Sequence, residues 1–261
     1  MKKNHRHYGA TEKRSCDEIL QDLPVNKEWA ETVIRRLKRI ATIPDHATIL
    51  DIGAASGEFL LACSELGYRC QGIEPFEAAR LNAAKLSELT GVYFQCVEGV
   101  AESIPFETNT FDVVHASSVI EHVLEVEKAF DEIYRVLKQG GVFWFSAASS
   151  MCPSQSEIRG FPLFGWYPDS LKRKIMNWAK DAKPHLVGYT NTPAINWFTS
   201  SKARTLLQKH GFQRVYDRWD LRGENEGGRV YRLALTTIRS TKLPKALADI
   251  IVPDCSYAAI K

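Results

Sequence analysis

The sequence predicts an α/β protein built on a mostly parallel, doubly wound sheet. Between residues 48 and 147, short apolar runs rich in β-branched residues alternate with segments whose apolar residues recur every three to four positions. Strands that alternate with helices favour parallel pairing through right-handed crossovers. The chain has 261 residues, 44% of them hydrophobic and 25% charged. A chain of this length can bury a large core without disulfides or a structural metal.

The first part of the chain is expected to form a helical lid. Residues 1–45 are polar at first, and the apolar residues from Trp29 to Ile40 then repeat at helical spacing until Pro44 ends the pattern. In the segment that follows, we expect strands at residues 48–52, 69–73, 93–97, 111–116 and 142–147, and helices at residues 58–66, 77–89 and 126–137.

The regular alternation stops after residue 147. Residues 148–198 are rich in proline and aromatic side chains and are expected to form an inserted cap. A helix at residues 199–210 and strands at residues 212–219 and 230–238 follow, and the turn-rich segment between these strands predicts an antiparallel hairpin at the sheet edge. The sheet would therefore have seven strands, the last of them antiparallel, followed by a C-terminal tail.

The net charge and the pattern of cysteines indicate which cellular compartment and which binding partners to expect. Lys and Arg exceed Asp and Glu by 34 − 31 = 3, too small an excess to predict a nucleic-acid partner. The six cysteines are scattered without a Cys-x-x-Cys pair, which is typical of reduced thiols. No signal peptide is recognisable, and no segment approaches the roughly 20 apolar residues of a membrane span. We therefore expect a cytoplasmic protein without a membrane partner.

The strongest local pattern is a glycine turn between a buried strand and a helix, in the stretch ILDIGAASGEFLLAC. Gly53 and Gly57 would let the backbone turn tightly and approach a ligand at the helix N-terminus. Glu74 ends the next strand, where a carboxylate can accept hydrogen bonds from both ribose hydroxyls of a nucleoside. The pattern therefore predicts a nucleoside-containing ligand.

Acidic residues around the turn disfavour a dinucleotide. The G-x-G-x-x-G pattern of dinucleotide-binding proteins has a third glycine where this sequence has Glu58, which would repel a pyrophosphate. Asp51, directly before the turn, likewise favours a cationic ligand over a phosphate. S-adenosylmethionine has the required character, because it joins adenosine to a sulfonium and an ammonium group.

Four motifs in order carry a family resemblance. They are Asp51-Ile-Gly53-Ala-Ala-Ser-Gly57, Gly72-Ile-Glu74-Pro75, Gly99-Val100-Ala101-Glu102-Ser-Ile-Pro105-Phe106, and Phe111-Asp112 with Ile120-Glu121-His122 and Gly140-Gly141. The stretch that contains them resembles the class I S-adenosylmethionine-dependent methyltransferases, particularly the small-molecule group that includes ubiquinone-biosynthesis O-methyltransferases. The resemblance implies a Rossmann-like fold, S-adenosyl-L-methionine as the cofactor and methyl transfer as the reaction. The chain would comprise an N-terminal helical lid (1–45), a cofactor-binding core (46–147), an inserted cap or substrate segment (148–198), the last helix and edge strands of the core (199–240) and a C-terminal tail (241–261).

The resemblance also implies which residues hold the cofactor. Those expected on the methionine side are Asp51, Gly53, Ala55 and Gly57, those at the ribose are Glu74 and Pro75, those at the adenine edge are Val100, Ala101 and Glu102, and Ser117 is a further contact. Ala55 stands in place of the central glycine of the family motif. Val100 stands in place of the Asp that contacts the adenine amino group in many relatives, so adenine would be held by the Ala101 backbone and by packing.

The methyl acceptor is expected at the carboxyl ends of the parallel strands, where such sheets bind ligands. A sulfonium is an activated methyl donor, so the protein mainly aligns the acceptor and excludes water. A hydroxyl acceptor also needs its proton removed. His122 after the fourth strand is the first candidate for this base, and His115, His185 and Tyr189 are further candidates. The alternative for His122 is a packing role.

Two further motifs bear on the class of acceptor. Quinone-type relatives place a divalent metal on E-x-x-E-H, whereas Ser118 stands in place of the first carboxylate here, so no metal is expected. Residues 116–119 read Ala-Ser-Ser-Val and lack the [D/N]-P-P-[Y/F] motif of nucleobase N-methyltransferases. O-methylation of a small metabolite or natural product is therefore expected first. The alternatives are N-methylation of a small molecule, metal-assisted methylation of a quinone precursor, and cofactor binding by a regulatory protein without turnover.

Overall fold

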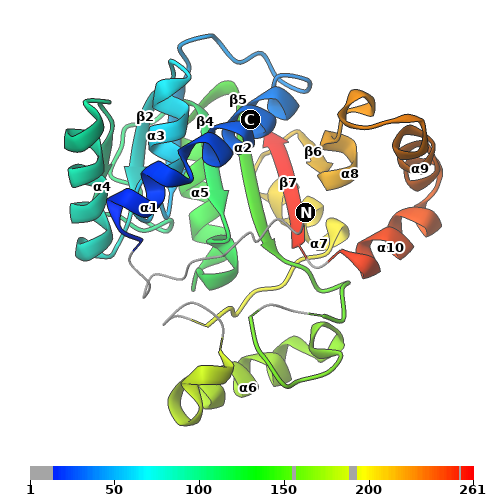
Figure 1. The fold of residues 1–261 in the computed structure, drawn as a ribbon. Helices are drawn as coiled ribbons and strands as arrows, with labels where there is room; N and C mark the ends of the chain where they lie inside the picture. Colours follow the sequence, from blue (N-terminus) through cyan, green and yellow to red (C-terminus); the bar gives the residue numbers. More distant parts are fainter. Residues whose placement is uncertain (1–13, 155–156, 188–192, 253) are drawn as a thin grey trace.

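The computed structural model describes residues 14–154, 157–187, 193–252 and 254–261. A central sheet is covered by helices on both faces, with α6 lying beyond one end of the strands (Figure 1). Within the described residues, seven strands form this sheet in the order β3-β2-β1-β4-β5-β7-β6. They are β1 (Thr48–Ile52), β2 (Arg69–Ile73), β3 (Gln95–Val97), β4 (Phe111–Ser117), β5 (Leu137–Ala148), β6 (Arg214–Asp217) and β7 (Asp254–Ile260).

The direction of the strands agrees with the sequence-based expectation. Strands β1 to β5 pair in parallel, and β7 lies antiparallel between β5 and β6. The prediction of a mostly parallel, doubly wound α/β sheet of seven strands with an antiparallel last strand is therefore confirmed. The carboxyl ends of the parallel strands all lie at the same end of the sheet, and this end faces the segment that contains α6 (Figure 1).

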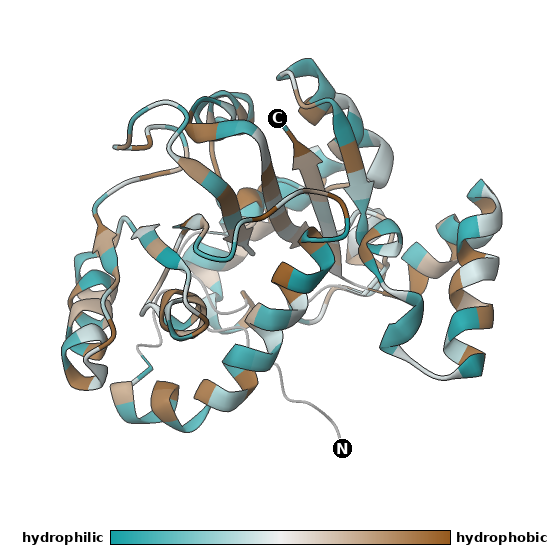
Figure 2. Ribbon diagram, turned by 90° about the horizontal axis from the view of Figure 1, so that it is seen from above, coloured by the Kyte–Doolittle hydropathy of each residue, from teal (hydrophilic) through white to brown (hydrophobic). Residues whose placement is uncertain are grey.

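The helices divide between the two faces of the sheet. Ile49 of β1 packs with residues of α2, α3 and α4, whereas Leu50 and Ile52 face the opposite cluster with residues of α5 and α7. Hydrophobic positions are concentrated in the central strands (Figure 2). The helices are α1 (Cys16–Gln21), α2 (Leu23–Leu37), α3 (Glu58–Glu65), α4 (Glu77–Thr90), α5 (Val126–Val136), α6 (Asp169–Ala182), α7 (Ser200–Lys209), α8 (Arg218–Leu221), α9 (Arg229–Ser240) and α10 (Lys242–Ile251).

The inserted segment after β5 has a small core of its own. Phe164, Met176 and Trp197 are almost fully buried there, and the Nζ atom of Lys172 lies 4.1 Å from the centre of the Trp197 ring. Other aromatic side chains of the segment, such as Trp166 and Trp178, are about half exposed. Its aromatic composition therefore serves both internal packing and the surface.

The structure corrects the prediction for the C-terminal part. Residues 230–238, expected to be a strand of an edge hairpin, belong to helix α9. Residues 241–261, expected to be a tail, contain α10 and β7, and Ala258 and Ala259 of β7 are fully buried. The hairpin prediction was wrong because β7 becomes a strand by filling the place between β5 and β6, which only long-range pairing determines.

Two further expectations can be compared with the fold. All six cysteines are free, and all except Cys96 are buried, in agreement with the prediction of reduced thiols. Among the described residues, no helix combines the length and the apolar character needed to cross a membrane.

Candidate functional site

The glycine turn at the carboxyl end of β1 is tightly confined. Gly53, Ala55 and Gly57 all have positive φ angles, of 68°, 48° and 86°. A Cβ atom added at Gly53 would lie 2.5 Å from Cγ2 of Val119, so no larger residue fits at position 53 without a shift. The turn therefore needs glycine at this point, and Ala55 adopts a left-handed conformation that alanine seldom occupies.

Glu74, directly after β2, lies against this turn. Its two carboxylate oxygens accept hydrogen bonds from the backbone N–H groups of Ala55 (3.0 Å) and Phe76 (3.1 Å). Arg80, which the sequence analysis missed, donates to the carbonyl oxygens of Glu74 (2.9 Å) and Pro75 (2.8 Å). These bonds fix both the carboxylate and the backbone at the end of β2. Pro75 beside it is exposed.

The charge around the turn is acidic. Burial raises the pKa of Glu74 above its usual value, and the nearby Asp51 carboxylate raises it further, against the two amide hydrogen bonds. Burial and Asp51 also raise the pKa of Glu58, while Arg14, 3.8 Å from the Glu58 carboxylate, acts in the opposite direction. Carboxylates that are costly to ionise would be stabilised by a cationic ligand and would disfavour a phosphate.

Asp51 has a partner that the sequence did not reveal. Its Oδ1 atom lies 2.6 Å from Nδ1 of His115, which sits opposite it in the β1–β4 register. The imidazole is 1% exposed and is stacked between Phe59, at 3.8 Å between ring centres, and Trp144, at 4.8 Å. His115 was a candidate base, but the structure places it within the layer that packs against α2 and α3.

The residues expected at the adenine edge fall into two groups. Val100 is 44% exposed and Ala101 is buried. Val100 therefore presents an apolar surface, and Ala101 beside it belongs to the core. Glu102 instead directs Oε1 at the backbone N–H groups of Leu124 (3.1 Å) and Glu125 (3.4 Å). The Glu102 carboxylate therefore holds the segment that leads into α5.

His122 ends a short 3-10 helix, Ile120–His122, directly after β4. The inserted segment is attached to this turn. The Nδ2 atom of Asn196 donates to the carbonyl oxygens of Val123 (2.7 Å) and Ile120 (3.3 Å), and the backbone N–H groups of Ile195 and Asn196 both donate to the Glu121 carbonyl oxygen. The end of the insertion therefore positions the His122 turn. Nothing in the local sequence pointed to Asn196, because its partners lie more than seventy positions earlier.

The remaining candidates lie in different places. Ser117, at the carboxyl end of β4, has its Oγ atom 3.2 Å from Oγ of Ser146 on β5. His185 is exposed in a 3-10 helix of the insertion. Tyr189 lies outside the described residues. Within the described residues there is no group of three or more His, Cys, Asp or Glu side chains that could hold a metal ion.

Arg14, just before α1, is linked to the glycine turn through Asn82. The Nδ2 atom of Asn82 on α4 donates both to the carbonyl oxygen of Arg14 and to Oγ of Ser56 within the turn. Helix α1 follows directly, and a capping box formed by Ser15 and Glu18 defines its first turn. Arg14 therefore lies beside the candidate cofactor site, although neither Arg14 nor Asn82 was identified from the sequence.

Comparisons with known proteins identify a methyltransferase domain in this part of the chain. Residues 50–145 match the family model described as "Methyltransferase domain". The uncharacterized methyltransferase YcgJ of Bacillus subtilis is 37% identical over 98 residues, which cover 36% of this chain and 38% of that protein. A malonyl-[acyl-carrier protein] O-methyltransferase of Marinomonas is 28% identical over 51% of this chain and 50% of that protein. This chain thus spans half or less of the length of these curated relatives.

The solved structures extend the likeness to the whole fold. The crystal structure of YcgJ aligns with 88% of this chain and 97% of that chain, with a TM-score of 0.53 and 18% identity. Phosphoethanolamine N-methyltransferase 2 of Haemonchus contortus, solved in complex with S-adenosyl-L-methionine, aligns with 96% of this chain and 58% of that chain, with a TM-score of 0.55 and 18% identity. The similarity therefore covers the sheet and the helices around it.

Proposed function

Because the chain contains a class I S-adenosylmethionine-dependent methyltransferase domain, we propose that it binds S-adenosyl-L-methionine and transfers its methyl group to a small molecule. The observation that carries this proposal is the position of Glu74. Its carboxylate is held by the amides of Ala55 and Phe76, one within the glycine turn and one just beyond β2. A carboxylate fixed there can accept hydrogen bonds from the two ribose hydroxyls.

The acidic surroundings of the turn support a cationic cofactor. The carboxylates of Asp51, Glu58 and Glu74 disfavour a bound phosphate and favour the ammonium and sulfonium groups of S-adenosyl-L-methionine. Val100 and Ala101 offer an apolar surface for the adenine ring. When bound, this cofactor supplies a methyl group on a positively charged sulfur, which is already activated for transfer.

The chain's own task would then be to position an acceptor and, for a hydroxyl, to remove its proton. His122 lies directly after the carboxyl end of β4, and Asn196 ties this turn to the inserted segment. A histidine in this position suits proton removal near neutral pH. We therefore place the acceptor between the His122 turn and the insertion, and favour O-methylation over N-methylation of a small molecule.

The test begins with the cofactor. Isothermal titration calorimetry should give one site per chain for S-adenosylmethionine and for its demethylated product. Fractionated metabolite extracts should then be incubated with protein and cofactor, and release of S-adenosylhomocysteine followed by mass spectrometry. Release that depends on one fraction, together with a product heavier by one methylene, would support catalysis. Tight binding without release from any fraction would favour a regulatory protein, and absence of binding would exclude both functions.

A further inference from the structure

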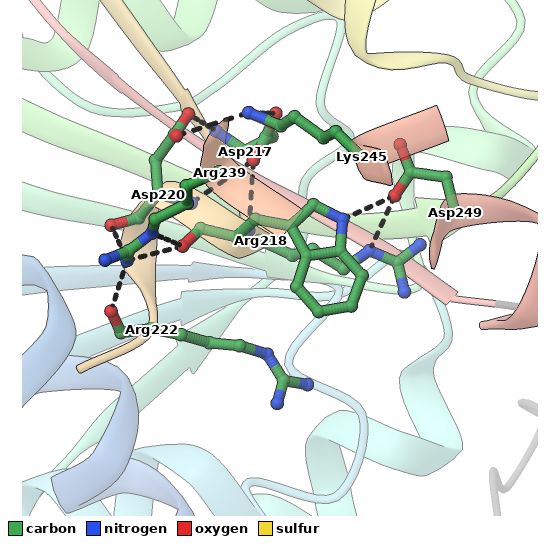
Figure 3. Close-up of polar contacts among 8 residues, drawn as sticks. Asp217, Arg218, Asp220, Arg222, Arg239, Lys245 and Asp249 are labelled. Carbon is green, nitrogen blue, oxygen red and sulfur yellow. Dashed lines mark hydrogen bonds and ion pairs between the residues drawn. The ribbon is translucent and has the colours of Figure 1, made fainter. Parts of the chain in front are cut away.

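The charged side chains between α8 and α10 form a cluster that holds two peripheral helices in place (Figure 3). The Nζ atom of Lys245 on α10 lies 2.6 Å from Oδ2 of Asp217 and 3.2 Å from Oδ1 of Asp220. One helical turn later, Oδ1 of Asp249 accepts a hydrogen bond of 2.7 Å from the indole of Trp219. These contacts attach α10 to β6 and α8. We call this group the α8–α10 cluster, and it serves below as the structural reference.

A different cluster of charges surrounds Lys172 of α6, within the inserted segment. Lys172 is only 1% exposed, and its Nζ atom contacts Oδ1 of Asp169 at 2.8 Å, the carbonyl oxygen of Gly165 at 3.4 Å and the Trp197 ring at 4.1 Å from its centre. Burial lowers the pKa of Lys172, while hydrogen bonding to Asp169 acts in the opposite direction. A buried ion pair adds little net stability, because desolvation offsets the attraction. What the ammonium adds over an apolar side chain of similar length is a directed contact with the Trp197 ring.

Trp197 is also held by a second lysine. The Nζ atom of Lys202, in the first turn of α7, donates to the carbonyl oxygen of Trp197 (2.8 Å) and lies 3.5 Å from Oδ2 of Asp169. The indole of Trp197 is fully buried, and its Nε1 atom has no hydrogen-bond partner within the part of the chain that the structure describes. The polar contacts that orient residue 197 therefore come from two lysines, which Asp169 joins.

Residues 195–197 connect these lysines to the His122 turn, and we call them the strap. On the α6 side, the Nε atom of Arg173 donates to the carbonyl oxygen of Ile195 (2.8 Å). On the other side, the backbone N–H groups of Ile195 (2.8 Å) and Asn196 (3.0 Å) donate to one carbonyl oxygen of the turn. The Asn196 side chain donates to two more carbonyl oxygens there. The strap therefore lies between α6 and the turn, and polar contacts hold it from both sides.

We propose that Lys172 is a positioning residue for methyl transfer, which holds the His122 turn in place at the acceptor site through Trp197 and the strap. The inference rests on the proposed function, in which His122 acts on an acceptor bound between this turn and the insertion. A misplacement of about 1 Å in a reacting group can lower a rate about a hundredfold. A lysine that does not touch the acceptor can therefore affect the reaction through the residues that it holds.

The first test measures how firmly the strap is attached. Amide hydrogen exchange of Ile195 and Asn196 reports the two backbone hydrogen bonds to the turn. Lys172→Met keeps a side chain of similar length without the charge, and should speed the exchange of both amides at least about tenfold. Lys245→Met is the matched control, because it removes an ion-paired lysine from the α8–α10 cluster, and it should leave both amides unchanged. The amides of β4, which should exchange alike in all three proteins, report global unfolding.

The second test follows His122 itself. In proton–carbon NMR spectra of the imidazole groups, the His122 signal is identified by its absence from His122→Gln. Lys172→Met should move or broaden this signal, whereas Lys245→Met should leave it in place. The signal of His46, which is exposed before β1, should stay in place in both variants. A lysine that only stabilises the insertion would leave the His122 signal unmoved, and this result would overturn the proposal even if the strap amides exchanged faster.

Asp169→Asn keeps the test valid if Lys172→Met fails to fold. The Asp169 side chain is 38% exposed, so the change is mild, and the loss of its charge loosens both lysines that hold Trp197. The strap amides and the His122 signal should change in the same direction as in Lys172→Met. A folded Asp169→Asn protein in which neither readout changes would likewise overturn the proposal.

Cofactor titration of the same preparations separates this proposal from the proposed function. The parent, Lys172→Met and Lys245→Met proteins should bind S-adenosylmethionine equally, because the contacts of both lysines lie away from the glycine turn. A parent protein that does not bind the cofactor overturns the proposed function and, with it, the positioning role. A parent that binds the cofactor, with the His122 signal unmoved in Lys172→Met and Asp169→Asn, overturns the positioning role alone.

Discussion

Asp51 and His115 form a buried ion pair or hydrogen bond directly beneath the glycine turn, with 2.6 Å between Oδ1 and Nδ1. The two residues lie opposite each other on β1 and β4, and Phe59 and Trp144 enclose the imidazole from both sides. The first acidic residue of the turn motif is therefore held by the core. Phe59 of α3 and Trp144 of β5 hold the His115 ring, and His115 in turn orients the Asp51 carboxylate.

The first prediction tests this pair. His115→Phe keeps an aromatic ring between Phe59 and Trp144 but leaves the buried Asp51 carboxylate without its hydrogen-bond partner. We expect the free energy of unfolding in urea to fall by about 1–3 kcal/mol, the cost of an unsatisfied buried group. His46→Phe is the control, because His46 is exposed and should tolerate the change. A His115→Phe protein as stable as the parent would mean that the pair makes no net contribution, as happens for some buried ion pairs.

The second prediction concerns the ribose contact. Glu74→Ala should weaken S-adenosylmethionine and S-adenosylhomocysteine binding at least about tenfold, because two charge-assisted hydrogen bonds of about 1.5–3 kcal/mol each are lost. Both ligands should be affected equally, since they share the ribose. Glu77→Ala, an exposed residue in the first turn of α4, is the control. Calorimetry with equal affinities for the parent and Glu74→Ala proteins would remove Glu74 from the ribose site.

The third prediction follows from the raised pKa of Glu74. Between the usual carboxyl value of 4.5 and the raised value, the folded protein binds a proton at this site that the unfolded chain has released. The contribution of Glu74 to stability is therefore greatest at low pH and falls as pH rises through this window. Urea unfolding of the ligand-free protein over the acid range should show this fall, and Glu74→Gln should show less of it. An identical pH dependence in both proteins would contradict the prediction, and Glu77→Gln should behave as the parent.

The glycine turn illustrates what the sequence can predict. The turn residues, the two strands beside it and Glu74 are joined by contacts between neighbouring elements, and each has a recognisable local pattern. The Asp51–His115 pair has no such pattern, since it depends on the register between β1 and β4. Asn196 was missed for the same reason, because its partners at Ile120 and Val123 are set by how the insertion returns to the sheet.

The C-terminal part was misassigned for a different physical reason. The run from Val230 to Ile238 is rich in β-branched and aromatic residues, and its propensity favours a strand. It is helical in the structure, where Arg239 attaches it to α8, and Val230 and Leu233 stay exposed while Leu235 is buried. The prediction of a strand assumed that the apolar residues of this run are buried in a sheet, and it fails where some of them are exposed. The true last strand contains Ala258 and Ala259, which have weak strand propensity and pair because β5 and β6 enclose them.

The fourth prediction concerns metals. Ser118 stands where quinone-type relatives have a carboxylate, and its backbone N–H donates to Oγ and to the carbonyl oxygen of Ser146. Two hard carboxylate ligands are therefore not available at this position for a divalent cation such as Mg²⁺. Once an acceptor is found, turnover should be unchanged after exhaustive treatment with EDTA. Activity that disappears with EDTA and returns with Mg²⁺ would favour metal-assisted methylation of a quinone precursor.

The last prediction separates the two roles open to His122. If His122 removes the acceptor's proton, His122→Ala should lower turnover about 10² to 10⁴-fold while leaving cofactor affinity nearly unchanged, since the imidazole acts only on the acceptor. Raising the pH should partly restore the rate with a hydroxyl acceptor, because hydroxide then competes as the base. If His122 only packs, the variant should lose about 1–3 kcal/mol of stability together with cofactor affinity.

Asn196→Ala provides the comparison for His122, because it loosens the same turn without removing the imidazole. Its loss of two hydrogen bonds to the Ile120 and Val123 carbonyls should lower the rate moderately but preserve the shape of the pH–rate profile. A base at His122 predicts that only His122→Ala alters that profile, whereas a packing role predicts that both variants change rate and stability in parallel. Turnover of His122→Ala at the parent rate, in a protein that is folded and binds cofactor, would exclude both roles and direct attention to His185 on the insertion.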